Sequence, residues 1–138
     1  MAIKIKVKNS GLIKISVRKD KRGNLFAAEA LRQIPFLIRR VYFLTDFKNS
    51  NTARGQHAHK KLNQVIFCLR GSFYLSLDDG KQKQKIRLSN PSLGILLRPK
   101  LWHSMSRFSK DCVILVVASD YYKETDYIRD YSDFKKLK

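Results

Sequence analysis

The chain has few acidic residues, few cysteines and no long hydrophobic run. Its 138 residues include 29 lysines and arginines against 11 aspartates and glutamates, which gives a formal net charge of +18. Such an excess is typical of proteins that bind nucleic acids, membrane surfaces or other polyanions. The basic residues are spread along the whole chain, however, and no helix-turn-helix, zinc-finger or aromatic RNA-binding pattern accompanies them. We therefore expect a basic, solvated surface and no nucleic-acid partner.

Cys68 and Cys112, the two cysteines, both fall inside apolar runs. Thiols in such positions predict buried free cysteines in a reducing compartment, and not a disulfide framework. No segment approaches the ~20 apolar residues that a membrane-spanning helix needs, and residues 1–6 contain no signal-peptide hydrophobic region. We expect a cytoplasmic protein with no membrane partner.

Strand patterns fill the chain, and no convincing long helix interrupts them. Besides the strand that carries His57 and His59, apolar residues alternate with polar ones or form short β-rich runs at residues 3–7, 13–17, 25–30, 41–44, 65–69, 73–77, 85–88, 93–97 and 112–118. About ten short strands predict an all-β sandwich or barrel, in one domain over residues 1–138. We favour a double-sheet jelly roll.

The connections carry their own signals. Asp78-Asp79-Gly80 predicts a tight hairpin. Pro99 is expected to begin a loop that bears Trp102 and His103, and a short helical turn is expected near residues 123–126. The tyrosines of the C-terminal tail are expected to pack across a subunit boundary.

His57 and His59 stand two residues apart in a segment of strand character. Residues i and i+2 of a strand project from the same face, so the two imidazoles would lie side by side, about 7 Å apart along the strand. Histidine is the side chain whose unperturbed pKa lies nearest neutrality. The pair therefore suits either proton transfer or metal binding.

Two motifs resemble the halves of the cupin signature: Gly55-x-His57-x-His59, and Pro91-x-x-Gly94 with Pro99-x-x-x-His103. In metal-binding cupins the first half continues to a glutamate, and Gln64 stands at that position here. A neutral amide is a poorer ligand for a divalent cation than a carboxylate and contributes no charge. His57, His59 and His103 could still bind a metal as a three-histidine site, so a metal-dependent cupin oxygenase is one competing hypothesis.

The resemblance to one cupin family extends over residues 10–134, nearly the whole chain. The matching motifs are, in order, Ile34-Pro35-Phe36, Arg40-Val41-Tyr42, Arg54-Gly55-x-His57-Ala58-His59-Lys60, Gln64, Gly71-Ser72, Asp78-Asp79-Gly80, Trp102-His103-x-Met105, Ala118-Ser119-Asp120-Tyr121-Tyr122 and Asp126-Tyr127-Ile128-Arg129-Asp130-Tyr131. Through these motifs the chain resembles the sugar 3,4-ketoisomerases, which are FdtA-like and WxcM-like cupins. That resemblance implies a cupin-type jelly-roll subunit, a homodimer that exchanges N-terminal strands, no metal and no cofactor.

The reaction implied by the resemblance converts dTDP-4-keto-6-deoxyglucose to a dTDP-3-keto-6-deoxyhexose. The product would then be aminated to a 3-amino-3,6-dideoxy sugar for cell-surface polysaccharide, such as lipopolysaccharide O-antigen or an S-layer glycan. The expected partner is therefore a dTDP-linked keto-sugar, with no nucleic acid beyond its nucleotide moiety.

The residues support that chemistry. Moving a ketone from C4 to C3 requires a base that removes the C3 proton, an acid that delivers a proton to C4, and proton exchange between two oxygens, but no redox cofactor. Two histidines on one strand face can share these steps. We assign His59 as the acid/base at carbon and His57 as its partner at the oxygens. Arg54 and Tyr42 are the expected donors to the enediolate, and the basic charge would steer a doubly anionic substrate.

Four further residues are expected to contact the substrate: Gln64, Trp102, Lys60 and His103.

Two more hypotheses compete with the ketoisomerase. A sugar-nucleotide 3,5-epimerase also abstracts a proton beside the C4 ketone, but its usual pattern pairs one histidine with an aspartate and a tyrosine. A non-enzymatic cupin that binds a small ligand or a nucleic acid would show no turnover and a salt-dependent affinity for polyanions.

Overall fold

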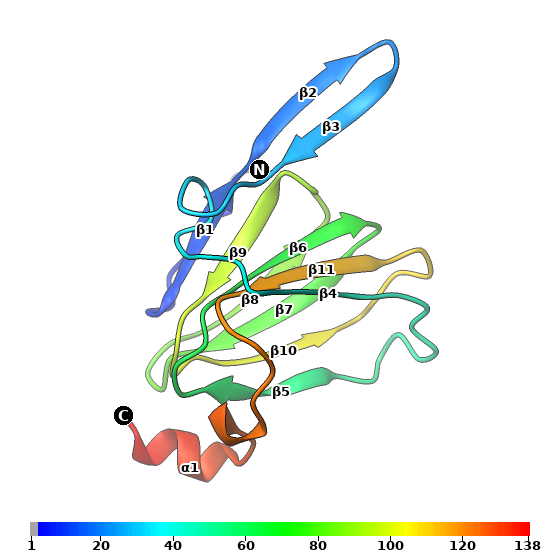
Figure 1. Cartoon of the computed structure of the whole chain (residues 1–138). Helices are drawn as coiled ribbons and strands as arrows, with labels where there is room; N and C mark the ends of the chain where they lie inside the picture. Colours follow the sequence, from blue (N-terminus) through cyan, green and yellow to red (C-terminus); the bar gives the residue numbers. More distant parts are fainter. Residues whose placement is uncertain (1–2) are drawn as a thin grey trace.

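The computed structural model describes residues 3–138, and its core consists of two five-stranded antiparallel sheets packed as a sandwich (Figure 1). The first sheet contains, in order, β1 (Ser10–Lys14), β9 (Leu93–Leu97), β6 (Gln64–Arg70), β11 (Val113–Ala118) and β4 (Arg40–Leu44). The second contains β12 (Tyr127–Ile128), β5 (Arg54–His59), β10 (Trp102–Ser106), β7 (Phe73–Asp78) and β8 (Lys83–Leu88). The predicted all-β, single-domain jelly roll is confirmed, in the form of an open sandwich.

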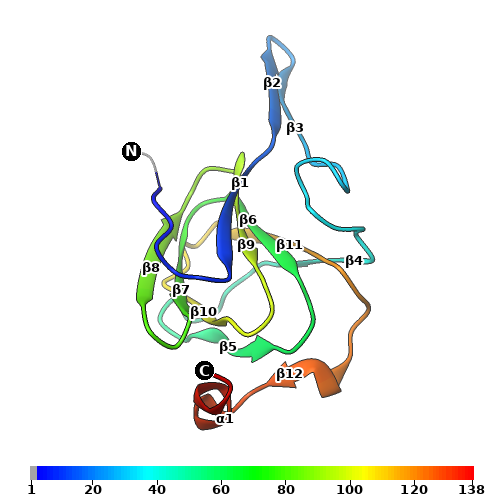
Figure 2. The same cartoon turned by 90° about the vertical axis from the view of Figure 1, so that its left-hand side faces the viewer.

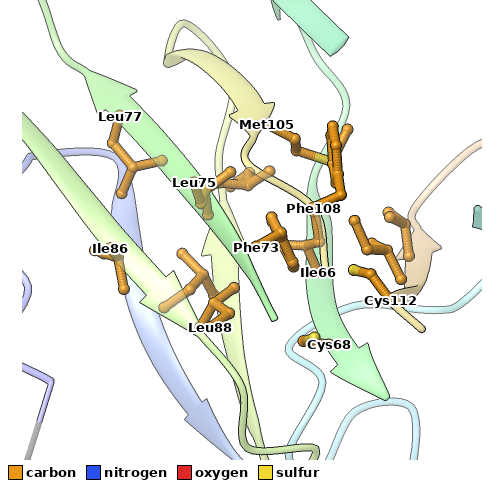
Figure 3. Close-up of a cluster of buried hydrophobic side chains, with 14 of the residues drawn as sticks. Ile66, Cys68, Phe73, Leu75, Leu77, Ile86, Leu88, Met105, Phe108 and Cys112 are labelled. Atoms are coloured by element: carbon orange, nitrogen blue, oxygen red, sulfur yellow. The ribbon is translucent and has the colours of Figure 1, made fainter. Parts of the chain in front are cut away.

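The main core lies between the two sheets. On β7, Phe73, Leu75 and Leu77 are buried while the residues between them are half-buried, which is the alternation expected of a strand with one face inward. They pack with side chains of the opposite sheet such as Ile114 and Ile66, which is labelled in Figure 3. Each fully buried Leu, Ile or Phe stabilises the fold by about 1.5–3 kcal/mol relative to an exposed one.

A second apolar cluster covers the outer face of the first sheet. Val65, Phe67 and Leu96 point away from the main core and pack against the irregular segment at residues 28–39, whose Ile34 is fully buried. Strand β6 is therefore buried on both faces from Gln64 to Cys68, which explains its continuous apolar sequence.

A hairpin of β2 (Ser16–Asp20) and β3 (Gly23–Ala27) projects away from the sandwich (Figure 1). Its tip and sides contact little of the same chain, and Leu25 and Phe26 are 58% and 38% exposed. The strand predicted at residues 25–30 therefore begins and ends earlier in the sequence, because β3 ends at Ala27.

The strand predicted at residues 3–7 is wrong. This segment runs beside β8 (Figure 2) without a backbone ladder. Instead, the Lys6 N–H donates to Gln84 Oε1 at 2.9 Å, and Gln84 Nε2 donates to the Lys4 carbonyl at 2.6 Å. The alternating sequence arose because Ile3 and Ile5 face the core, and an extended segment against a core shows the same period of two as a strand.

In the C-terminal half of the chain, one prediction is wrong and another is incomplete. Trp102 and His103 lie on strand β10 and not on a loop. The helical turn near 123–126 is confirmed as the 3-10 helix η1 (Glu124–Asp126), but the helix α1 (Tyr131–Lys136), capped by the Asp130 side chain, was not foreseen. No helix within residues 3–138 is long and apolar enough to cross a membrane.

Candidate active site

Three histidines meet on the inner face of the second sheet. His57 and His59 project from the same face of β5, as predicted, and the backbone register of β10 places His103 directly opposite His57. The ring centroid of His57 lies 4.8 Å from those of both His59 and His103. The candidate residue His103 is thereby brought to the predicted pair, and the three imidazoles form one cluster.

The start of β5 brings the backbone close to this cluster. Gly55 has φ of +68°, a left-handed conformation that favours glycine. A Cβ atom there would lie 3.3 Å from Met105 Cε and 3.5 Å from the His57 ring. The glycine of the predicted motif therefore leaves room for His57.

His59 is held by a carboxylate from the C-terminal tail. Its Nδ1 lies 3.1 Å from Asp126 Oδ2, and its side chain is only 3% exposed. Its Nε2 is buried and has no hydrogen-bond partner within residues 3–138. The next residue, Tyr127, pairs with His59 in the β12–β5 ladder, and its ring centroid lies 4.4 Å from that of His59 and 4.9 Å from that of His57.

His103 has a different partner. Its Nδ1 lies 3.1 Å from the carbonyl oxygen of Leu101. A carbonyl can only accept, so Nδ1 carries the proton and the Nε2 lone pair is free for another group.

Burial keeps all three imidazoles neutral at pH 7. Burial is the largest cause that lowers the pKa of His57 to about 2, and the neighbouring histidines lower it further. Burial likewise lowers the pKa of His103 to about 4. It also lowers the pKa of His59, although the Asp126 carboxylate opposes this shift. Each ring therefore offers one N–H donor and one basic lone pair, so it can both donate and accept a proton.

Two cavities flank the cluster and share Arg40 and Tyr127 as walls. One, of about 350 Å³, reaches His59, Lys60 and Asp126. The other, of about 420 Å³, reaches His57 and is also lined by Tyr42, Leu44, Arg54, Gly55, Gln56, Met105, Tyr122 and Arg129. Cavities of this size suit small-molecule ligands.

Arg40 stands between these cavities. Its guanidinium carbon lies 5.0 Å from the centroid of the Tyr42 ring and 5.7 Å from that of Tyr122. Its Nε is buried and, among the described residues, has no hydrogen-bond partner. A buried donor without an acceptor costs free energy, and an anionic group in the cavity would remove that cost.

Tyr42 and Gln64 form a pair behind the His57 cavity. Gln64 Nε2 donates to the Tyr42 hydroxyl at 2.8 Å, and Gln64 is only 2% exposed. Burial raises the pKa of Tyr42, so its phenol remains a neutral donor. Gln64 is thus placed to orient Tyr42, whereas Arg54 and Lys60 lie exposed at the cavity rims.

The structure does not bring Trp102 to the histidines. It lies on the opposite face of β10 from His103, with its ring centroid 5.2 Å from Tyr131 and 5.7 Å from Phe134, both on α1. Its role there is to pack the C-terminal helix against the second sheet.

Three residues of the site were missed by sequence reasoning: Arg40, Asp126 and Tyr127. Arg40 lies two residues before Tyr42 in a predicted strand, so both side chains share one face of that strand. This spacing could have identified Arg40 as a site residue. Asp126 and Tyr127 belong to a motif of the family resemblance, but no local pattern assigns them to the site, because they reach it through the pairing of β12 with β5, about 70 residues away. Tyr122 and Tyr127, expected at a subunit boundary, line the His57 cavity.

A family model described as FdtA: WxcM-like, C-terminal, matches residues 8–138. The chain belongs to this family. A curated relative from Aneurinibacillus thermoaerophilus, TDP-4-oxo-6-deoxy-alpha-D-glucose-3,4-oxoisomerase, is 54% identical over 117 residues, which cover 85% of this chain and 84% of the relative.

Solved structures agree with this membership. A histidine-to-asparagine variant of the 3,4-ketoisomerase QdtA from Thermoanaerobacterium thermosaccharolyticum, in complex with TDP-4-keto-6-deoxyglucose, is 41% identical with a TM-score of 0.93, over 96% of this chain and 95% of that one. The TDP-quinovose 3,4-ketoisomerase WlaRB from Campylobacter jejuni is 39% identical with a TM-score of 0.89, over 94% and 99%. The jelly roll of this FdtA-family chain is therefore that of the 3,4-ketoisomerases.

The three histidines were also a candidate metal site. One nitrogen from each ring lies within 4.8 Å of the others. Two nitrogens bound to one Zn²⁺ at about 2.1 Å are at most about 4.2 Å apart. Histidine nitrogens separated by as much as 4.8 Å would have to move closer together to bind the same ion. Gln64, at the position of the usual glutamate, is bonded to Tyr42 and brings no negative charge. The cluster fits a proton shuttle better than a metal.

Proposed function

We propose that this FdtA-family protein is a TDP-sugar 3,4-ketoisomerase that converts dTDP-4-keto-6-deoxyglucose to a dTDP-3-keto-6-deoxyhexose through an enediol. The observation that carries the proposal is the cluster of three neutral histidines, with a free lone pair at His59 Nε2, beside cavities large enough for a sugar. The 54% identity to a TDP-4-oxo-6-deoxyglucose 3,4-oxoisomerase supports the same reaction.

His59 is the base and acid at carbon. Its Nε2 lone pair removes the C3 proton, while an N–H donor protonates the C4 oxygen, and the enediol forms. The imidazolium of His59 then returns its proton to C4. His57, 4.8 Å away between ring centroids, donates the proton to the C4 oxygen and takes one from the C3 hydroxyl. All protons are returned, so the two histidines leave the cycle as they entered it.

Basic and phenolic groups stabilise the charge that develops on the oxygens. Tyr42 and Arg54 face the His57 cavity, where donors aimed at an enediolate lower the barrier. We add Arg40, which lines the same cavity and whose buried Nε has no hydrogen-bond partner among the described residues. Arginine side chains also bind diphosphate in a forked geometry, and the net charge of +18 steers the anionic substrate.

A homodimer that exchanges N-terminal strands is part of the proposal. The projecting β2–β3 hairpin supports it, because Leu25 and Phe26 would otherwise expose apolar surface to water. Sedimentation equilibrium should give twice the 16.1 kDa mass of the chain. A monomer at micromolar concentration would rule the exchange out.

We further propose a cytoplasmic enzyme whose 3-keto product is aminated to a 3-amino-3,6-dideoxy sugar for lipopolysaccharide or S-layer glycan. The chemistry supports this place, because a C3 ketone is the functional group that a transaminase converts to an amine. Incubation with a sugar transaminase should give an amino sugar only when the protein is present. An equal yield without it would contradict this assignment.

The function is tested by incubating dTDP-4-keto-6-deoxyglucose with the protein in EDTA and locating the ketone by carbon NMR. A ketone at C3, and its absence with a folded His59→Asn variant, would support the ketoisomerase. Inversion at C3 and C5 with the ketone still at C4 would indicate an epimerase. Turnover only after iron or manganese is added would indicate a metal-dependent cupin, and no turnover in either case would favour a binding protein.

A further inference from the structure

We infer that Asp126 is a positioning residue that holds His59 with its Nδ1–H toward the tail and its Nε2 lone pair toward the cavity. The inference deepens the proposed function and rests on it, because it concerns how His59 is prepared for proton transfer. Asp126 ends the 3-10 helix η1, and the next residue begins β12.

The carboxylate of Asp126 is itself fixed by the loop that follows β5. Asp126 Oδ1 accepts from the Lys61 N–H at 2.9 Å, and Oδ2 accepts from the Leu62 N–H at 3.3 Å in addition to its 3.1 Å contact with His59 Nδ1. The Asp126 carbonyl also accepts from the Lys60 N–H at 2.9 Å. The chain that supplies His59 therefore also supplies the donors that orient its partner.

This contact selects one tautomer of His59. An ionised carboxylate can only accept hydrogen bonds, so the shared proton lies on Nδ1 and the lone pair lies on Nε2. Nε2 is buried and without a partner within the described part of the chain. A buried acceptor left unpaired is unfavourable. His59 lines the cavity of about 350 Å³, and a substrate group bound there would supply the missing partner.

The same contact distinguishes His59 from the other two histidines. When His59 takes a proton, its imidazolium stands beside the Asp126 carboxylate, which stabilises the charge. Within residues 3–138, His103 hydrogen-bonds to the neutral Leu101 carbonyl, and the Glu124 carboxylate that favours protonation of His57 is itself bonded to Tyr122 and Arg129. The other charged groups that influence His59, Arg40 and Arg129, oppose protonation. Among the three histidines, His59 is thus the one equipped to carry the proton between C3 and C4.

The test compares Asp126→Asn with Asp133→Asn, a matched control on α1 whose exposed carboxylate pairs with Lys136 at 3.9 Å. Asparagine supplies one acceptor oxygen where three donors converge, so His59 loses its fixed tautomer. We expect kcat of Asp126→Asn to fall at least about 10-fold and by up to about 10⁴-fold, the loss seen when the aspartate that orients a catalytic histidine is replaced by asparagine. The KM should change less than about threefold, and the control should match the unmodified protein.

Nitrogen-15 NMR of the unmodified protein reads the tautomer directly. A protonated Nδ1 on His59, replaced by a mixture of tautomers in Asp126→Asn, supports the inference. A protonated Nε2 on His59, or an unchanged kcat in a folded Asp126→Asn variant, overturns it. If Asp126→Asn does not fold, the tautomer of the unmodified protein and the kcat of Asp126→Glu still test the inference. The kcat of Asp126→Glu is expected to lie between that of the unmodified protein and that predicted for Asp126→Asn. Lack of turnover by the unmodified protein would reject the proposed function and leave the tautomer measurement valid.

Discussion

Acidification should destabilise this protein, because its buried neutral histidines resist protonation in the folded state, and the contribution of His103 can be calculated. The pKa of His103 is lowered from 6.5 to about 4 by burial, so between these values the unfolded chain binds a proton that the folded chain excludes. Stability is therefore fully present above about pH 6.5 and is lost as the pH falls toward 4. At about pH 5 the linkage relation gives a loss of about 2 kcal/mol from this one side chain, against a typical total of about 5–15 kcal/mol.

Urea unfolding at about pH 7.5 and about pH 5, at one protein concentration, measures this loss for the unmodified protein and for His103→Gln. Glutamine retains an amide donor for the Leu101 carbonyl but does not titrate. The variant is expected to be less stable at neutral pH and to lose about 2 kcal/mol less than the unmodified protein on acidification. Equal losses in the two proteins would refute the idea that His103 is buried in its neutral form.

Two other substitutions separate packing from substrate binding. Trp102→Ala should lower the melting temperature, because the indole packs against Tyr131 and Phe134, and should leave kcat/KM within about threefold; a large loss of kcat/KM with unchanged stability would place Trp102 at the substrate after all. Arg40→Met should raise KM for the TDP-sugar by about 10-fold or more, the scale of one charge-assisted hydrogen bond, while Arg40→Lys recovers part of the loss. Unchanged KM in a folded Arg40→Met protein would exclude Arg40 from binding.

Features set by local periodicity were predictable from the sequence. The strand with His57 and His59 on one face follows from the two-residue repeat, and the Asp78-Asp79-Gly80 hairpin joins β7 to β8 as its turn residues indicate. Strand β10 was missed because Trp102 is covered by α1 on the outer face. Both of its faces are therefore partly apolar, and the alternation that marks a strand is lost.

Features set by long-range contacts were not predictable from local patterns. The Asp126–His59 contact joins residues 67 positions apart through a two-residue strand, and nothing near residue 126 indicates that pairing. The N-terminal segment shows the converse, since residues 3–7 have the period of a strand but find side chains of Gln84 instead of a neighbouring backbone. Periodicity reports which side of a segment is buried, and pairing depends on what lies beside it.

The central claim is proton transfer at adjacent carbons by His59, and proton NMR of dTDP-4-keto-6-deoxyglucose in D₂O with excess EDTA tests it most directly. The unmodified protein is predicted to give a 3-keto sugar that carries at C4 either the proton transferred from C3 or, where the His59 imidazolium exchanges with D₂O before the transfer, deuterium. His59→Asn should retain the C3 proton of the substrate, whereas His57→Asn should still exchange it slowly. Deuterium at C5 with the ketone still at C4, or C3 exchange undiminished in His59→Asn, would contradict the account.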